Sequence, residues 1–478
     1  MQIDIATQIE AAKAALAAGE PRRAIELANS LLETRPRTPA AYLVRSQGHQ
    51  MAGNGTFAIC DLLDGLALDG LRPPLVARFE TEILAKLDHA LDHNVLALQA
   101  VIEAADVHAK SPRIAAAARL TALLLAHEVD RALEFGLGLG AELVSAYSKR
   151  LMSRLLLSHC RIEEAIVSLE DSLRLARKSI IMEPDLGLMV EFWQSHTRHL
   201  RDTTIYPPRY RMAVCSVIKN EADDIAEWIV HHAGIGVEAF YIYDNGSTDD
   251  TPRILDALSK RYTIIRYSLL HQPAQSLTYW HFLQTHRFDA EWAALIDADE
   301  FINPESGSIS GYLDRDEACA GIAMNWSTFG SSGHKTRPQG LCIESFIRRA
   351  PDDFMSNAMI KGIIRPHRFI RFRGPHQQLL FGHYEDGLGN KVFPINSRVQ
   401  PPRHGGLRLH HYLVKSEEQA AQKMARGNPR VETHPMKYRD RNYFQWNDCN
   451  DLEDTSMLRF APAIHETLAG IPNLPPRR

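Results

Sequence analysis

The hydrophobic pattern of this 478-residue chain changes at Pro207-Pro208. In residues 1–200, which are rich in Ala, Leu, Glu and Arg, apolar residues recur at spacings of three and four, and this predicts successive helices. Two consecutive prolines cannot continue a helix, so residues 201–211 are expected to form a hinge. Beyond the hinge, short apolar runs alternate with helical segments. The sequence therefore predicts an all-α domain over residues 1–200 and an α/β domain over residues 206–478.

A weak repeat runs through the helical region. The segment that begins at Gly19 recurs at Gly53, 34 residues later, and again at Cys160. In each copy a turn is followed by a small residue and then an apolar one: Ala24-Ile25, Ala58-Ile59 and Ala165-Ile166. This pattern resembles the tetratricopeptide family, whose helical hairpins repeat about every 34 residues; an unrelated helical bundle is the alternative. The region would serve either as a packing module or spacer, or as a peptide-binding surface for a protein partner.

The second region shows the alternation of an α/β sheet. Its apolar, β-branched runs predict buried strands at Met212–Ile218, Ala239–Tyr243, Thr263–Tyr267 and Trp292–Ile296. Helical stretches lie between these strands at Asp223–Ala233, Pro252–Lys260 and Leu277–Thr285. Such alternation predicts parallel strands joined by right-handed crossovers, with ligands bound beyond the carboxyl ends of the strands.

Composition narrows the class of protein. The formal net charge of −4 and the pI of about 6.6 give no reason to expect a nucleic-acid partner. Six scattered cysteines without a CxxC pair disfavour a zinc site built from clustered thiolates, and they fit a reducing compartment. Neither a signal peptide nor a long uncharged apolar stretch is present in this sequence. We expect a cytoplasmic protein, with any membrane contact peripheral and at the inner face.

Polar residues follow three of the predicted strands: Lys219-Asn220-Glu221, Asp244-Asn245-Gly246-Ser247 and Asp297-Ala298-Asp299-Glu300. Side chains alternate along an extended strand end, so Asp297 and Asp299 should point the same way. Paired carboxylates bind a hard divalent cation, although solvated loop acids and helix caps give the same pattern. Asp244 would either cap a turn or accept the imide N–H of a uracil ring.

The motifs at these strand ends resemble those of a known family. The runs VCSVIKNEADDIAEWIVHHAGIGVEAFYIYDNGSTDDT and AALIDADEF are similar to inverting glycosyltransferases of family 2, which have the GT-A fold. They are more similar still to the related family 92, which includes galactan synthases. Three later segments match that second group: Trp326–His334, Lys361–Pro366 and His410–Gly427. The resemblance covers about residues 210–430 and implies a GT-A fold.

The resemblance also implies roles for individual residues. It places Asp297, Asp299 and His411 at a metal, with Mn²⁺ or Mg²⁺ as the expected ion. The residues expected to bind the nucleotide-sugar donor are Lys219, Glu221, Asp244, Asp297, Lys361 and Lys415. At Lys415 a merely solvated side chain is an equal alternative.

An inverting mechanism needs a general base for the acceptor hydroxyl. We expect this base to be Glu344, with Asp352 and Asp353 as alternatives. The sequence thus predicts an enzyme that moves a hexose from a UDP-sugar to a glycan or glycolipid. One competing hypothesis is a helical-repeat adaptor with an inactive glycosyltransferase-like domain. A nucleotidyltransferase would usually carry a basic, Gly-rich loop, which KNEADD is not.

Overall fold

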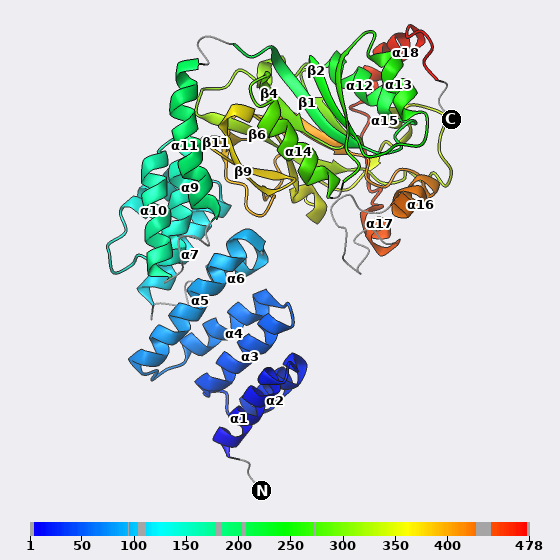
Figure 1. Cartoon of the computed structure of the whole chain (residues 1–478). Helices are drawn as coiled ribbons and strands as arrows, with labels where there is room; N and C mark the ends of the chain where they lie inside the picture. The colour runs from blue at the N-terminus through cyan, green and yellow to red at the C-terminus, as the bar shows by residue number, and fades with distance from the viewer. Residues whose placement is uncertain are drawn as a thin grey trace. The chain divides into compact units, whose positions relative to one another are not determined.

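The computed structural model describes residues 4–93, 95–103, 111–176, 184–202, 207–271, 273–426 and 441–475. It divides into two compact units, Met1–Glu191 and Phe192–Arg478 (Figure 1). Within the described residues, no helix is long and apolar enough to cross a membrane.

The first unit is helical, as the periodicity predicts. Successive helices pack in pairs, with α1 on α2, α2 on α3, α3 on α4 and α9 on α10. The helices are α1 (Ile5–Ala17), α2 (Pro21–Thr34), α3 (Pro39–Met51), α4 (Gly55–Ala67), α5 (Pro73–His93), α6 (Val95–Glu103), α7 (Pro112–Leu125), α8 (Val129–Leu137), α9 (Ala146–Ser158), α10 (Ile162–Leu175) and α11 (Pro184–Asp202), of which the last extends into the second unit.

The turns of the helical unit confirm the repeat and extend it. Gly19, Gly53 and Cys160 all have positive φ. The small residue five positions after each of them, Ala24, Ala58 or Ala165, is completely buried. The same geometry occurs in a fourth copy that the sequence did not reveal, where His127 has φ 60° and Ala132 is completely buried. A left-handed residue at the helix C-terminus is usually glycine, so histidine concealed this copy.

The second unit is built on a mixed sheet. Its strands run in the order β12-β11-β6-β8-β4-β1-β2-β3, and β13 pairs with both β5 and β6. The strands of this sheet are β1 (Tyr210–Ile218), β2 (Ala239–Asp244), β3 (Thr263–Ser268), β4 (Ala290–Leu295), β5 (Glu300–Pro304), β6 (Cys319–Thr328), β8 (Ile360–Ile364), β11 (His383–Glu385), β12 (Lys391–Val392) and β13 (Leu407–His411). Two further pairs of strands lie outside it: β9 (Phe369–Gly374) with β10 (Gln377–Leu380), and β7 (Arg348–Arg349) with β14 (Leu452–Glu453). β1, β2, β3 and β4 are parallel and confirm the four predicted strands, whereas β8 runs antiparallel to both β4 and β6.

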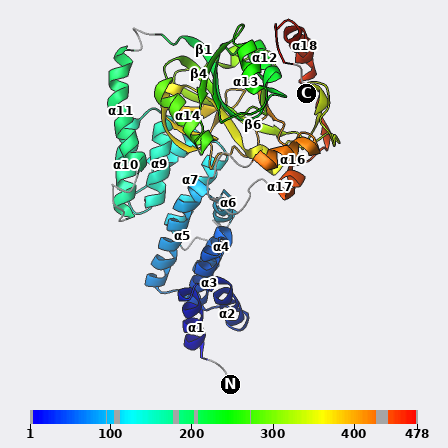
Figure 2. The same ribbon diagram turned by 45° about the vertical axis from the view of Figure 1, so that its right-hand side comes forward.

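Helices cover both faces of this sheet (Figures 1 and 2). The helices are α12 (Ile225–Gly234), α13 (Thr251–Leu258), α14 (Ala274–Thr285), α15 (Cys342–Ser345), α16 (Glu417–Arg426), α17 (Arg441–Asn447) and α18 (Ala461–Ala469). Side chains of α12, α13 and α18 pack with Val214 in one core, and side chains of α14 pack with Cys215 in another. Neighbouring residues of β1 thus enter opposite cores, which explains why the strand is apolar at nearly every position.

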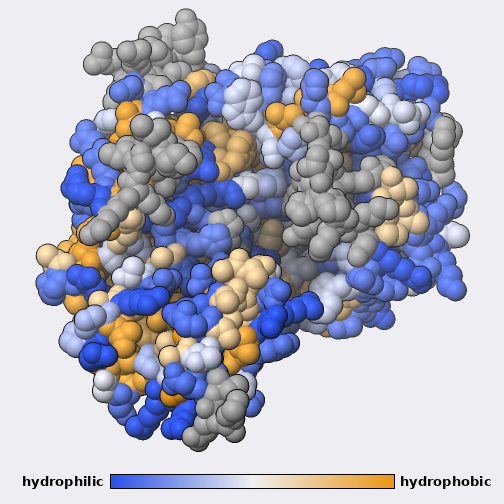
Figure 3. Space-filling model, turned by 60° about the horizontal axis from the view of Figure 1, so that its bottom comes forward, coloured by the Kyte–Doolittle hydropathy of each residue, from blue (hydrophilic) through white to orange (hydrophobic). Residues whose placement is uncertain are grey.

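On the face drawn in Figure 3, groups of hydrophobic residues lie between hydrophilic ones. Isolated exposed apolar residues are normal on folded proteins, and they do not by themselves indicate a binding surface.

Candidate functional site

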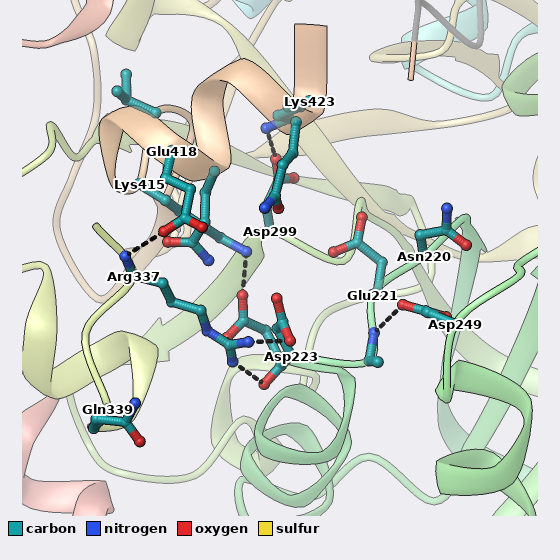
Figure 4. Close-up of a pocket in the computed structure, with 15 residues that line it drawn as sticks. Asn220, Glu221, Asp223, Asp249, Asp299, Arg337, Gln339, Lys415, Glu418 and Lys423 are labelled. Atoms are coloured by element: carbon teal, nitrogen blue, oxygen red, sulfur yellow. Dashed lines mark hydrogen bonds and ion pairs between the residues drawn. The ribbon is translucent and has the colours of Figure 1, made fainter. Parts of the chain in front are cut away.

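A cavity of about 540 Å³ opens beyond the carboxyl end of β1, against α16 (Figure 4). Its lining is strongly charged. The acidic residues that line it are Glu221, Asp223, Asp224, Asp249, Asp299 and Glu418, and the basic ones are Arg337, Lys415 and Lys423. Six carboxyl groups against three cations leave an excess of three acidic groups, so a polyanionic ligand would need further positive charge in this cavity.

Asp299 lines the cavity, and a histidine and a lysine lie close to its carboxylate. Its Oδ1 is 3.7 Å from His411 Nε2, and its Oδ2 accepts a hydrogen bond from Lys423, which reaches it from α16 (Figure 4). Burial alone would raise the pKa of Asp299, but Lys423 and His411 outweigh it and hold the pKa well below its usual value. Asp299 is therefore ionised at neutral pH.

His411 is buried behind Asp299 and is not among the residues that line the cavity, and its imidazole is neutral. Burial lowers its pKa, and the attraction of Asp299 only partly opposes this effect. Its ring packs on Trp326, with ring centroids 4.3 Å apart. A distance of 3.7 Å from a carboxylate oxygen is compatible with both groups holding one ion. Asp299 and His411 thus fit a divalent cation, provided that Lys423 moves away from the carboxylate.

Asp297 has different surroundings from Asp299. β4 ends at Leu295, and the amide of Glu300 donates to the carbonyl of Asp297 in a turn, so strand alternation does not continue to Asp299. Among the described residues, Asp297, Asp299 and His411 do not bring ligand atoms within 4.8 Å of one another as a set. Contrary to the expectation from alternation, the two carboxylates therefore serve different contacts.

The contacts of Asp297 lie in a buried polar cluster. Gln275 donates to Asp297 Oδ1 at 2.6 Å, and Lys361 Nζ lies 3.2 Å from Asp297 Oδ2 and 3.6 Å from Glu300 Oε2. Trp326 donates its indole N–H to Glu300 at 2.8 Å. Burial raises the pKa of Glu300 to about 8, while Lys361 opposes the shift. Lys361 is completely buried and holds acidic side chains, and it does not line the cavity.

Of the other residues predicted to bind the sugar donor, only some line the cavity. Glu221 and Lys415 line the cavity, whereas Lys219 and Asp244 do not. Asp244 accepts the backbone N–H of Ser247 at 2.8 Å, which is the turn-capping alternative. Lys415 is buried, and its Nζ lies 2.5 Å from Asp224. Burial would lower the pKa of Lys415, but Asp224 outweighs it and raises the pKa, so the ammonium is charged.

Glu344 lies on the one-turn helix α15. Its carboxylate accepts the backbone N–H of Leu341 at 3.1 Å and lies 3.0 Å from His465 Nε2. Glu344 is not among the residues that line the cavity. Of the two alternatives, Asp352 pairs with Arg349 at 2.8 Å.

Several lining residues were missed by sequence reasoning. Arg337 pairs with Asp223 and donates to the carbonyl of Asp223 at 3.1 Å, although it lies in a loop far from the strand ends. Lys423 belongs to a segment that the family resemblance already covered. The spacing in the sequence could have identified Lys423, because Gln419 and Lys423 are four residues apart and therefore share one face of α16.

The comparison with known families concerns the second unit. Residues 210–443 match the family model of glycosyltransferase family 92, which supports a glycosyltransferase. A family 92 protein of Oryza sativa subsp. japonica is 36% identical over 95 residues, which are 20% of this chain and 16% of the relative. One of Ricinus communis is 29% identical over 174 residues, which are 33% of this chain and 29% of the relative. The chain thus spans less than a third of the length of these family 92 relatives.

Among solved structures, the chain is similar to a thermophilic tetratricopeptide protein of Thermus thermophilus. The identity is 16%, the match covers 38% of this chain and 97% of that chain, and the TM-score is 0.25. A TM-score this low supports no argument about the fold. The assignment of a helical repeat therefore depends on the turns and buried alanines of the first unit.

Proposed function

We propose that the second unit is an inverting, GT-A type glycosyltransferase that binds a nucleotide-sugar, with a UDP-hexose as the expected donor. The observation that carries this proposal is the pairing of Asp299 with His411 at a charged cavity inside the family 92 segment. The acceptor class that we propose is a glycan or glycolipid.

A divalent cation, Mn²⁺ or Mg²⁺, would be held by Asp299 and His411. When bound, such an ion neutralises the charge that develops on the leaving diphosphate. It also supplies the positive charge that the acidic lining lacks. Mixed oxygen and imidazole ligands favour Mn²⁺ over Ca²⁺.

The three basic side chains of the lining have a common feature: each one is paired with a carboxylate. Lys423 pairs with Asp299, Lys415 with Asp224, and Arg337 with Asp223. A donor diphosphate would compete for these cations, and Lys423 would then leave Asp299 available to the metal. The side chains would thereby orient the diphosphate against the wall of the cavity.

The general base remains a prediction from the sequence. We propose Glu344, although its carboxylate caps α15 at Leu341 and contacts the side chain of His465. Glu344→Gln should lower turnover about a hundredfold while leaving donor affinity nearly unchanged, because base catalysis contributes about that much. Turnover near the wild-type value would leave Glu344 with the capping role alone and direct attention to Asp352 and Asp353.

A thermal-shift screen of nucleotides and nucleotide-sugars, with and without Mn²⁺, tests the function. UDP or a UDP-sugar should raise the melting temperature in the presence of Mn²⁺ and much less in its absence. The competing hypothesis is an adaptor with an inactive domain. It predicts no metal-dependent stabilisation by any nucleotide, and such a result would reject the enzyme.

A further inference from the structure

Three metal-ligating side chains meet on the sheet at a place separate from the charged cavity. Cys319 begins β6, and His383 and Glu385 lie on β11. Their ligand atoms all lie within 4.8 Å of one another, and all three residues are buried. None of them lines the cavity beyond β1.

The strand register explains the cluster. His383 is the direct partner of Cys319 on the neighbouring parallel strand. Glu385 follows His383 by two positions, so both side chains point to the same face of β11. The geometry therefore brings a thiol, an imidazole and a carboxylate to one face, although 64 positions separate Cys319 from His383.

Ordinary hydrogen bonds leave this cluster incompletely explained. His383 Nε2 lies 2.9 Å from Glu385 Oε1, which is a good hydrogen bond. The contact of Cys319 Sγ with the carbonyl of Gly321, at 3.5 Å, is a weak one. A buried thiol beside an imidazole and a carboxylate is the donor set that borderline metals prefer.

The surroundings hold Glu385 in place. Arg315 Nε lies 3.3 Å from Glu385 Oε2, the oxygen that does not contact His383. Arg315 is itself anchored, because its Nη2 donates to the carbonyl of Gly387 at 3.1 Å. Metal-ligating carboxylates commonly have such an outer partner, which fixes their orientation. Arg315 adds a positive charge nearby, so the site requires both anionic ligands to hold a divalent ion.

We propose that Cys319 Sγ, His383 Nε2 and Glu385 Oε1 bind one zinc ion, with water completing the coordination. A thiolate, an imidazole and a carboxylate suit Zn²⁺, whereas Mn²⁺ and Mg²⁺ prefer oxygen ligands. The thiolate and the carboxylate together balance the charge of the ion. Binding releases the thiol proton of Cys319 to solvent. The ion would link the short strand β11 to β6.

Metal analysis and cobalt substitution of the full chain test this proposal. After its metal has been removed with a chelator and zinc has been added back, the protein should contain one zinc ion per chain. Replacement of zinc by Co²⁺ should produce a thiolate-to-cobalt charge-transfer absorption, which reports a cysteine ligand directly. Cys319→Ala should abolish this absorption. The matched control is Cys215→Ala, because Cys215 is also a completely buried strand cysteine and should leave the absorption intact.

Two more variants keep the result interpretable. Glu385→Gln preserves the size of the side chain and should weaken zinc binding by at least about tenfold, even if Cys319→Ala fails to fold. Asp299→Asn should leave the cobalt absorption unchanged, so the test is independent of the proposed transferase site. Wild-type protein without the charge-transfer absorption, or Glu385→Gln with wild-type affinity, would overturn the zinc site.

Discussion

Lys361→Met should destabilise the second unit by about 3 kcal/mol, because it leaves the Asp297 carboxylate without its buried cation. Lys361 Nζ lies 3.2 Å from Asp297 and 3.6 Å from Glu300. At an effective dielectric constant of about 20, Coulomb's law gives about 5 kcal/mol for the attraction between Lys361 and Asp297. Desolvation cancels part of this energy, and breaking a buried pair typically costs about 3–5 kcal/mol. Because burial raises the pKa of Glu300 to about 8, Glu300 is mostly protonated at pH 7 and adds little, so we expect the lower end.

A second substitution shows whether charge is the cause. In Lys361→Met with Asp297→Asn, the carboxyl that faced the buried cation can no longer ionise, so part of the loss should be recovered. The double variant should therefore be more stable than the sum of the single effects predicts, by about 1–2 kcal/mol. Lys260→Met is the matched control, because Lys260 is exposed and its replacement should change stability by less than about 0.5 kcal/mol.

Tryptophan fluorescence during urea denaturation at pH 7 measures these changes. All six tryptophans lie at position 193 or beyond, so the signal reports the second unit. Trp326 contacts Glu300 directly and should sense the local change. The reasoning would be refuted if Lys361→Met unfolded at the wild-type urea concentration. It would also be refuted if the two substitutions were fully additive, since Lys361 would then not act by pairing with the Asp297 carboxylate.

Three further predictions follow from the site and the repeat. Burial raises the pKa of Glu300 from its ordinary value of 4.5 to about 8, so the free energy of unfolding that this group contributes is fully present below pH 4.5 and is lost as the pH rises towards 8. In urea titrations from pH 5 to 8, Glu300→Gln should therefore show a smaller loss of stability than the wild type. Asp299→Ala and His411→Ala should each weaken Mn²⁺-dependent UDP binding in calorimetry, and the double variant should lose clearly less binding free energy than the sum of the two single losses. If His411→Ala kept its metal dependence, His411 would not be a metal ligand. Cys160→Gly should stabilise the helical unit by up to about 1 kcal/mol in circular-dichroism melts, because Cys160 has φ 56°, while a lower melting temperature would show that its side chain contributes more than the strain costs.

Local patterns predicted the elements of the fold well. The apolar runs located β1, β2, β3 and β4, since a strand buried on both faces must be apolar at nearly every position. The start of helix α16 was also predictable, because Ser416 and Gln419 form a Ser-x-x-Gln capping pattern. In the structure the Ser416 hydroxyl accepts the backbone N–H of Gln419. The fourth helical repeat was not predictable in this way, because His127 takes a backbone conformation that usually signals glycine.

The sequence by itself determined which residue types stand at the strand ends, and it brought Asp299 and His411 together only through a family resemblance. The tertiary structure decided which of these side chains share a cavity. A turn after β4 separates Asp297 from Asp299, and α16 brings Lys423 to a carboxylate 124 positions away. The pairing of β6 with β11 likewise places Cys319 beside His383. Such contacts depend on how distant elements pack, and local propensity and spacing carry no information about that packing.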